Sequence, residues 1–473
     1  MTLRGRRPGD RRVRVEVLKP RAYEVRQPRR IRRPPPPAVV LIIGFAVLIA
    51  IGTVVLMLPF ARVDGGWTEP LVALFTATSA VCVTGLIVVD TGTYWSPFGH
   101  VVIIALVQIG GFGFMTGSTL LLFLLVGRRT GLRDRMLVQV STGVPDLGSV
   151  TAVVRRVAVF TLLVEGIGAA LLTIAFLGHG RDPIGALWWG TFHGISAFNN
   201  AGFDLVGEFR SLQPFVGDAL VLATVGVLIV LGGLGFAIVG DAVAKRRWSR
   251  FALETKVVLA TTAVLLAGGS IAVGAFEWGN PATLGALPEA QRPLNALFEA
   301  TTLRTAGFST VPTGSLVDPT LFVIMALMFI GGASGSTAGG IKVNTFSVLL
   351  VAILSSARGR PSAEAFGRRI PHAIVYRALS VALLSIAFVF VVSLSIEIVA
   401  STPFIQTVFE AISAFGTVGA STGITPDMPD AARVIVILAM FFGRLGPLTL
   451  VLALAARARP VSSRPAVETM RIG

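Results

Sequence analysis

The chain has 473 residues, of which 53% are hydrophobic and 14% are charged, and its formal net charge is +16. Because soluble domains contain about 25% charged residues, this composition excludes an ordinary soluble protein. The single cysteine, Cys82, also excludes an internal disulfide framework and an all-cysteine metal site. Long apolar runs predict instead an all-α polytopic protein of the cell membrane, because a helix of about 20 such residues crosses a bilayer.

The chain begins with a basic arm, residues 1–37, whose first 33 residues hold twelve Arg and one Lys against three acidic residues. Nucleic-acid binding is not predicted, because the arm has neither interleaved aromatic residues nor a folded module. Further basic clusters lie at residues 128–135, 245–250, 358–369 and 457–459, whereas the intervening connections are mainly acidic. Basic segments flanking membrane spans stay in the cytoplasm, so both termini are predicted to be cytoplasmic.

Beyond the arm, long apolar runs alternate with four shorter stretches that resemble one another. The long runs cover residues 39–60, 101–126, 157–177, 220–239, 257–273, 321–330, 378–396 and 434–456. The shorter stretches are LFTATSAVCVTGL (74–86), TFHGISAFNNAGF (191–203), LFEATTLRTAGF (297–308) and VFEAISAFGTVGAS (408–421). In each one, a Phe precedes a Gly by nine or ten residues. Four such matches in register indicate an internal repeat.

The repeat predicts four units of the form M1 span, short re-entrant helix with its loop, and M2 span. Their predicted bounds are residues 38–127, 128–244, 245–357 and 358–456, followed by a cytoplasmic tail at 457–473. Segments of about a dozen residues are too short to cross a bilayer, so the short helices must re-enter from the outer side. The expected fold has eight transmembrane helices and four pore helices in a pseudo-fourfold arrangement around one pore.

The loops after the short helices suit a cation. Non-helical backbone persists at membrane depth only where it is buried in protein or lines water. Carbonyl groups from four such loops can replace the hydration shell of a cation, and each short helix would point its partially negative C-terminal end to the same place. Glycine tolerates the backbone angles that this requires. A chloride pore would instead need helix N-termini or basic rings.

Each second span carries its own cluster of small residues. The clusters are IGGFGF (109–114), LGGLGF (231–236), IGGASGS (330–336) and FGRLGP (442–447). Helix packing through small residues and a role in the pore both remain open for them. In the fourth cluster Arg444 stands where the other units have Gly111, Gly233 and Gly332. An Arg at that depth is costly and indicates a function.

The four loops, together with IGGASGSTAGGIK (330–342), resemble the Ktr/Trk/HKT superfamily of potassium transporters over residues 39–456. With eight predicted spans, the chain is more similar to the bacterial KtrB-type membrane subunit than to TrkH. The resemblance implies that four glycines select K+, with some Na+ passage or dependence left open. The implied filter residues, which would bind K+, are Val83, Thr84, Gly85, Asn200, Ala201, Gly202, Thr305, Ala306, Gly307, Thr417, Val418 and Gly419.

The same resemblance implies a gate in the third unit, where several glycines disfavour a continuous helix. The implied gate residues are Gly332, Ala333, Ser334, Gly335, Ser336, Thr337, Ala338, Gly339, Gly340, Lys342 and Arg444. We expect Arg444 to donate to carbonyls of residues 333–340; the alternative is an ion pair with an acidic neighbour. Lys342 is expected either in the pore or at the inner surface, which its long side chain can reach.

Three further charged residues lie in the short helices and their loops. Glu299 and Glu410 share one repeat position, and we expect them early in their helices, as structural residues first and ion-attracting residues second. Arg304 is expected to brace the third loop by hydrogen bonding.

Two other classes of protein share some of these features. A secondary transporter of another cation or small solute also has broken helices and repeats, but it would be expected to show two large inverted halves. The GASG motif around Ser334 is similar to that of intramembrane proteases, but no His lies in mid-span to activate the serine, so an enzyme is not predicted. The resemblance further implies a homodimer on a cytoplasmic ring of KtrA/TrkA-like nucleotide-binding regulatory subunits, and the basic segments also suit anionic membrane lipid.

Overall fold

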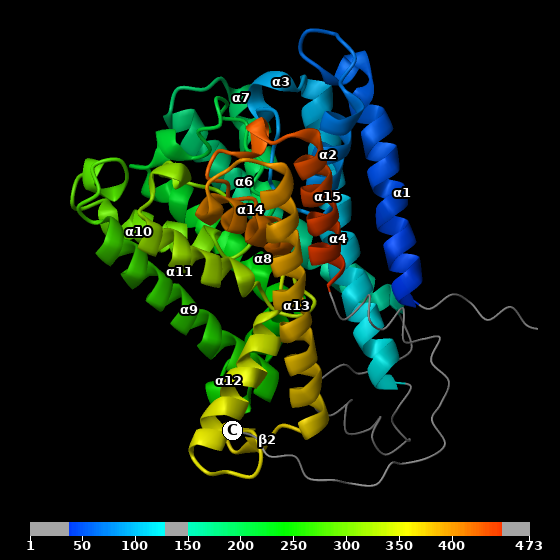
Figure 1. Cartoon of the computed structure of the whole chain (residues 1–473), viewed down its shortest axis with the longest axis vertical. Coiled ribbons are helices and arrows are strands. Elements are labelled where there is room, and N and C mark those ends of the chain that lie inside the picture. Colours follow the sequence, from blue (N-terminus) through cyan, green and yellow to red (C-terminus); the bar gives the residue numbers. More distant parts are fainter. Residues whose placement is uncertain (1–36, 128–149, 447–473) are drawn as a thin grey trace, which may run out of the picture. The chain divides into compact units, whose positions relative to one another are not determined.

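The computed structural model describes residues 37–127 and 150–446. The basic arm, the basic cluster at 128–135 and the C-terminal tail lie outside the described residues. The first half of the described chain contains α1 (Pro37–Met57), α2 (Pro70–Val81), α3 (Thr91–Tyr94), α4 (Pro97–Gly127), α6 (Val150–Gly178), α7 (Pro183–Phe198) and α8 (Ala219–Lys245). Figure 1 shows these elements in the blue-to-green part of the chain.

The second half continues the same alternation of long and short helices. It contains α9 (Leu253–Glu277), α10 (Arg292–Thr302), α11 (Asp318–Phe329), α12 (Val343–Ala357), α13 (His372–Val399), α14 (Phe404–Gly416) and α15 (Asp430–Leu445). Two short strands, β1 (Glu364–Ala365) and β2 (Arg368–Arg369), form an antiparallel hairpin between α12 and α13. Single 3-10 turns occur at Pro59–Ala61, Gln213–Phe215, Trp248–Arg250, Leu284–Ala286, Thr313–Ser315 and Thr425–Asp427.

Five of the described helices are long and apolar enough to cross a membrane: Val39–Met57 in α1, Val154–Gly178 in α6, and the whole of α8, α9 and α13. The three other predicted spans correspond to α4, to α11 and to α15, whose predicted span continues beyond the described residues. The predicted all-helical multi-span class is therefore confirmed, apart from the small hairpin. In the third unit the helix is interrupted between α11 and α12, as the glycines predict.

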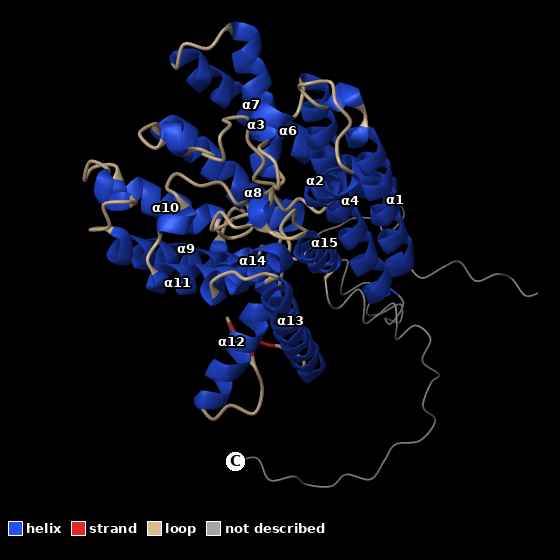
Figure 2. Ribbon diagram, turned by 45° about the horizontal axis from the view of Figure 1, so that its top comes forward, coloured by secondary structure: helices blue, strands red, loops and turns tan. Residues whose placement is uncertain are grey.

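Each short helix packs between two longer helices, which belong to its own unit except that α10 packs against α8 of the preceding unit. Helix α2 contacts α1 and α4, α7 contacts α6 and α8, α10 contacts α9 and α8, and α14 contacts α13 and α15. Figure 2 shows that the loops after these helices gather in the centre, surrounded by helices. The repeated packing brings four segments that are far apart in sequence to one place.

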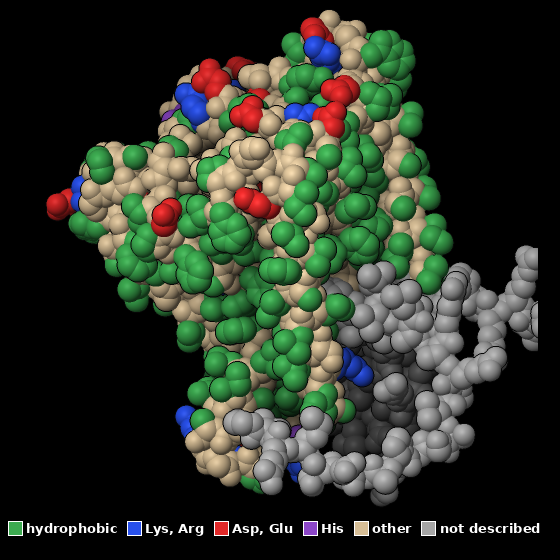
Figure 3. Space-filling model, viewed as in Figure 1, with side chains coloured by type: hydrophobic (Ala, Val, Ile, Leu, Met, Phe, Trp, Pro, Cys, Tyr) green, Lys and Arg blue, Asp and Glu red, His purple; other side chains and the backbone are tan. Residues whose placement is uncertain are grey.

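The exterior and interior have the polarity expected of a membrane protein. Large apolar side chains face outward on the long helices, for example Leu162 on α6 and Phe390 on α13, which are 65% and 67% exposed. Figure 3 shows hydrophobic side chains over the flanks of the helices, with Asp and Glu side chains confined to the upper half of this view. Polar side chains such as Glu410 and Arg444 are fully buried. The interior therefore holds polar and charged groups among its apolar core.

Candidate ion pathway

The loops that follow α2, α7, α10 and α14 share one backbone conformation. We call residues 83–85, 200–202, 305–307 and 417–419 the four glycine loops. In each, the first and third residues have positive φ, between 48° and 92°, and the middle residue does not: Val83 and Gly85, Asn200 and Gly202, Thr305 and Gly307, Thr417 and Gly419. Alternation of positive and negative φ turns successive carbonyl groups toward one side of the chain, which is the arrangement that channel filters use.

The glycine loops also pack on one another in a closed order. A Cβ atom added to any of the four glycines would overlap a carbonyl oxygen of the next loop: Gly85 with Ala201, Gly202 with Ala306, Gly307 with Val418, and Gly419 with Thr84. Because the fourth loop contacts the first, the four loops form a ring of backbone. Glycine is required at these positions both by the positive φ and by the lack of space.

Each glycine loop is anchored to its own short helix. The amide of the middle loop residue donates to a carbonyl near the C-terminal end of that helix: Thr84 to Ser79 (2.8 Å), Ala201 to Ser196 (2.8 Å), Ala306 to Thr302 (2.7 Å) and Val418 to Ser413 (2.9 Å). In the third unit the Phe-to-Gly spacing is one residue shorter, yet the anchoring bond is kept. The helix ends and loops therefore form four equivalent building blocks.

Buried side chains of the short helices brace the chain that leaves each loop. Glu299 accepts a hydrogen bond from the amide of Thr310 (2.7 Å), and Glu410 accepts one from the amide of Thr422 (2.9 Å). His193, at the same repeat position, lies 3.4 Å from the amide of Leu205. The structural interpretation of the two carboxylates agrees with these contacts. The expectation that they lie early in their helices is wrong, because Glu299 is the eighth of the 11 residues of α10 and Glu410 is the seventh of the 13 residues of α14.

The small residues of the inner helices allow close backbone contact. A Cβ atom on Gly110, Gly232 or Gly443 would overlap the carbonyl oxygen of Val81, Phe198 or Phe415, respectively, at the C-terminal end of a short helix. The packing interpretation of these clusters therefore agrees with the structure in three units. In the third unit the corresponding Gly331 instead contacts Gly339, because the helix is interrupted there.

Residues 330–342, which we call the broken-helix loop, run between α11 and α12. The amides of Ala333 and Thr337 donate to the carbonyls of Gly233 (2.8 Å) and Gly232 (3.2 Å) on α8. Helix α8 is itself irregular at this level, since Gly235 has φ 73° and ψ 165°. An irregular residue interrupts the helical hydrogen bonds around it, which leaves these carbonyls available to the loop.

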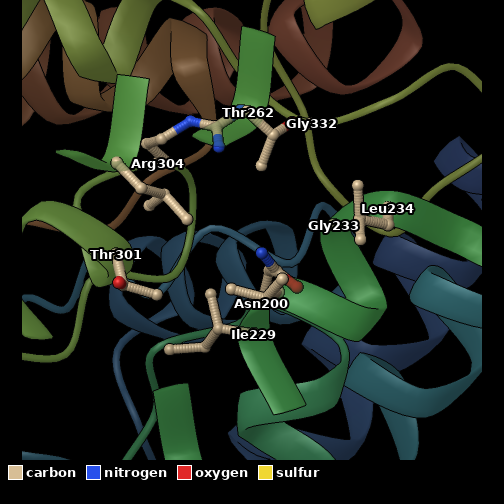
Figure 4. Close-up of a pocket in the computed structure, with 10 residues that line it drawn as sticks. Asn200, Ile229, Gly233, Leu234, Thr262, Thr301, Arg304 and Gly332 are labelled. Atoms are coloured by element: carbon tan, nitrogen blue, oxygen red, sulfur yellow. The ribbon is translucent and has the colours of Figure 1, made fainter. Parts of the chain in front are cut away.

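The broken-helix loop contacts the glycine loops directly. Thr337 Oγ1 donates to the carbonyl of Phe198 at 3.2 Å. The orientation of the Asn200 amide that satisfies its neighbours has Nδ2 donating to Thr337 Oγ1 (3.1 Å) and Oδ1 accepting from Thr305 Oγ1 (3.2 Å). Figure 4 shows a small cavity beside this contact, lined by Asn200 from the second glycine loop, Gly233 from α8 and Gly332 from the broken-helix loop.

Three basic side chains donate to carbonyls of the broken-helix loop. Arg444 Nη1 donates to Thr337, within the expected range 333–340, and Nη2 lies 3.4 Å from the carbonyl of Gly110. Lys342 Nζ donates to Ala338, so its ammonium group stays at the loop. Arg304 Nη2 donates to Gly331 (3.2 Å), which is the bracing contact expected of it.

The other residues predicted to form a gate lie along the same loop. Within it, the Ser336 hydroxyl donates to the carbonyl of Ala333 (2.6 Å), and the amide of Ser334 donates to Asn344 Oδ1 (2.9 Å). Gly335 and Gly340 have positive φ values of 77° and 61°, which close the two bends of the loop. The loop is thus a compact, internally bonded segment between the two halves of the interrupted helix.

Sequence reasoning missed one polar residue near the glycine loops. Glu165 lies in mid-span in α6 and is 4% exposed. Its carboxylate accepts hydrogen bonds from Asn199 Nδ2 (2.9 Å) and Gln108 Nε2 (3.0 Å). The signal for it was present, because Glu165 is the one charged residue in the apolar run 157–177.

The chain is similar in sequence to proteins of known function. The sequence model of the TrkH family, described as cation transport protein, matches residues 32–460. The chain belongs to the TrkH family. The family transports ions and is not a family of enzymes, so this member is a multi-pass membrane transport protein, and the predicted resemblance to the Ktr/Trk superfamily is confirmed.

Individual relatives of this TrkH-family chain cover most of its length. Ktr system potassium uptake protein B of Bacillus subtilis is 42% identical over 422 residues, which is 89% of this chain and 93% of that protein. Potassium/sodium uptake protein NtpJ of Enterococcus hirae is 36% identical over 434 residues, covering 91% and 95% of the two chains. The crystal structure of the potassium transporter TrkH from Vibrio parahaemolyticus superposes with a TM-score of 0.69 at 18% identity, covering 90% of this chain and 86% of that one. This last likeness supports the fold.

Proposed function

We propose that this chain is the ion-conducting subunit of a potassium uptake system. K+ passes down its electrochemical gradient through a filter of backbone carbonyls supplied by the four glycine loops. The observation that carries the proposal is the closed order in which each loop glycine packs on a carbonyl of the next loop. Carbonyl groups around one axis can replace the water around a cation. The names of the Bacillus and Enterococcus relatives, both potassium uptake proteins, support the choice of ion.

The proposed architecture is four M1–P-loop–M2 units in pseudo-fourfold arrangement around one pore, with the unit bounds 38–127, 128–244, 245–357 and 358–456. The shared φ pattern and the shared anchoring bond to each short helix support this arrangement. The outer spans are α1, α6, α9 and α13, and the pore helices are α2, α7, α10 and α14. The inner spans are α4, α8, the interrupted pair α11 and α12, and α15.

The proposed selectivity is for K+, with Na+ as the second ion to be tested. A glycine stands at the third position of every loop, so no side chain narrows the ring. The twelve residues of the glycine loops are the proposed K+ site. Na+ enters the proposal because the Enterococcus relative is named a potassium/sodium uptake protein.

The proposed gate comprises residues 332–340 with Lys342 and Arg444. Closure is supported by the contacts of Thr337 with Phe198 and Asn200, which put the loop directly against the second glycine loop. Arg444 holds this position from the fourth unit through the carbonyl of Thr337. Opening requires this contact and the loop's bonds to α8 to break.

The proposed assembly is a homodimer in the cell membrane, with both termini and a nucleotide-binding regulatory ring on the cytoplasmic side. The word "system" in the names of the Ktr relatives supports a protein that works with further subunits. Limited proteolysis of sealed spheroplasts and of inverted vesicles tests the orientation. The basic arm is expected to be cleaved only in inverted vesicles, and cleavage in spheroplasts would contradict the orientation.

The function is tested by cation flux into liposomes that contain the purified full-length protein. Uptake of K+ and Rb+ well above Na+ and Li+ is expected. Gly85→Ser should admit more Na+, because the added side chain displaces the carbonyl of Ala201 that lies against Gly85. Equal uptake of Na+ by the unaltered protein would overturn the selectivity. No flux of any cation, even after deletion of residues 333–339, would favour a secondary transporter of another solute.

A further inference from the structure

A buried polar cluster lies behind the second glycine loop, built by three helices. Glu165 comes from α6, Gln108 from α4, and Asn199 directly follows α7. Both carboxylate oxygens of Glu165 accept hydrogen bonds, Oε1 from Asn199 Nδ2 at 2.9 Å and Oε2 from Gln108 Nε2 at 3.0 Å. Asn199 Nδ2 also lies 3.0 Å from Gln108 Oε1, so the three side chains form one cluster.

The cluster is joined to the second glycine loop through Asn199. This residue is the C-cap of α7 and immediately precedes Asn200, the first residue of the loop. Its side chain is completely buried, and a Cβ atom on Gly111 of α4 would overlap its Oδ1. Asn199 therefore has little freedom to move, and Glu165 is one of three acceptors around its amide nitrogen, with Gln108 and the carbonyl of Ile195.

The residue at the position of Asn199, three before the loop glycine, differs in the other units. This position is occupied by Cys82 in the first, Arg304 in the third and Gly416 in the fourth. The surroundings of the four loops are therefore electrically unequal although their backbones are alike. A carboxylate lies behind the second loop, whereas a guanidinium group lies behind the third.

The charge of Glu165 needs a counter-charge. Both of its oxygens accept hydrogen bonds from amide groups, and such bonds favour the charged form of a carboxyl group. Within residues 37–127 and 150–446, no Lys, Arg or His forms an ion pair with it. An intramembrane carboxylate is costly unless its charge is balanced, and such residues mark ion pathways. A cation bound in the adjacent glycine loop, which Asn199 directly precedes, would supply such a charge.

We propose that Glu165 is a positioning and specificity-determining residue that raises the K+ affinity of the filter from behind the second glycine loop. It does so by holding Asn199 in place and by adding a negative potential that acts on the bound ion. The inference rests on the proposed K+ conduction. It predicts that K+ affinity depends on the charge of this cluster more than on the position of that charge within it.

The test compares four full-length proteins in liposomes, with uptake measured over a range of K+ concentrations. These are the wild type, Glu165→Gln, the double variant Glu165→Gln/Gln108→Glu, and the control Glu397→Gln, which removes an exposed carboxylate at the end of α13. Glu165→Gln is expected to raise KM about five- to tenfold with maximal uptake within about twofold, because a nearby unit charge is lost at an effective dielectric constant of about 20. The double variant should return KM to within about twofold of the wild type, since Asn199 already contacts both residues.

Folding is monitored by the thermal midpoint of each purified protein, with and without K+. The stabilisation by K+ should be reduced in Glu165→Gln and recovered in the double variant, which gives a readout of ion binding without transport. An unchanged KM for Glu165→Gln in a protein that conducts K+ would overturn this inference alone. A raised KM that the double variant does not lower would show a structural role and would also overturn it. A wild type without K+ flux would overturn the proposed function, and this inference with it.

Discussion

The glycine loops and the broken-helix loop both place non-helical backbone among the central helices, but they are held in different ways. A glycine loop is fixed by backbone contacts, to its own short helix and to the carbonyl of the next loop. The broken-helix loop also makes backbone contacts, but several of its bonds come from side chains, namely the hydroxyl of Thr337 and the guanidinium groups of Arg444 and Arg304. Its two amide bonds to α8 depend on the irregular backbone at Gly235.

This difference suggests how one chain combines a rigid element with a movable one. Backbone packing in a closed order cannot be released at one loop without disturbing its neighbours. Separate hydrogen bonds, by contrast, contribute about 1 kcal/mol each, or about 1.5–3 kcal/mol where a charged group takes part. A loop held by a few such bonds can adopt a second conformation at a small cost in free energy. The binding of a regulatory partner can then favour that conformation. The following substitutions test the contrast.

The largest effect is expected from Gly307→Ala in the third glycine loop. Gly307 has φ 73°, and a Cβ atom there would overlap the carbonyl oxygen of Val418. A strained residue of this kind costs about 1–3 kcal/mol, so K+ uptake into liposomes should fall roughly ten- to hundredfold. The matched control is Gly226→Ala in α8, where no atom lies within 4 Å of an added Cβ. Wild-type flux in Gly307→Ala would contradict the rigid backbone ring.

Arg444→Gln should increase K+ flux where Gly307→Ala decreases it, because it loosens the broken-helix loop. The substitution removes the charged donor to Thr337. Loss of a charged hydrogen bond worth about 1.5–3 kcal/mol should raise basal K+ flux about tenfold or more. Arg433→Gln is the control, since Arg433 lies on the same helix but donates to Pro426 and Asp430. If the two variants conduct equally, Arg444 does not hold the loop closed.

Thr337→Val should produce a smaller increase in basal flux. Valine keeps the shape of the side chain but removes the hydroxyl that contacts Phe198 and Asn200. One neutral hydrogen bond is worth about 0.5–1.5 kcal/mol, so basal flux should rise about two- to tenfold. Thr53→Val removes a hydroxyl that bonds within α1 and serves as the control. An unaltered basal flux would mean that Arg444 and the bonds to α8, and not the Thr337 hydroxyl, keep the loop closed.

The smallest effect is expected at Asp218, the N-cap of α8, which bonds to His179 and to the first turn of its own helix. Burial alone would raise the pKa of Asp218, but hydrogen bonds from His179 and from the amides of Val221 and Leu220 outweigh it and lower the pKa. A carboxylate with a lowered pKa stabilises the fold above its ordinary pKa of about 3.9, and this contribution disappears as the pH falls through the folded-state pKa. Because the pair with His179 is partly exposed, its contribution is at most about 1 kcal/mol.

Asp218→Asn should therefore lower the thermal midpoint slightly at pH 7 and lose that effect at acidic pH, with K+ flux unchanged. The thermal midpoint of the purified protein between pH 3 and pH 8 measures this. A change in basal flux would contradict the view that only contacts of the broken-helix loop control it.

The sequence by itself determined the membrane class, the family, and the positions of the short helices and their glycines. The class and the positions follow from local signals, because an apolar run long enough to cross a bilayer and a Phe followed nine or ten residues later by Gly are readable without any partner. The family follows from the resemblance of the four loops and of residues 330–342 to known transporters. The interruption between α11 and α12 was readable for the same reason, since glycines disfavour a helix wherever they occur. Arg444 was recognised from its position in the repeat.

Only the tertiary structure decided which groups meet. The order in which the glycine loops pack, the bond between Thr337 and Asn200, and the cluster of Glu165 with Gln108 and Asn199 join residues from separate parts of the chain. The direction of Glu299 and Glu410 was also decided there, because it depends on the turn of each short helix that faces the returning chain. Such pairings depend on how helices are rotated and packed, and a single sequence contains no local signal for either.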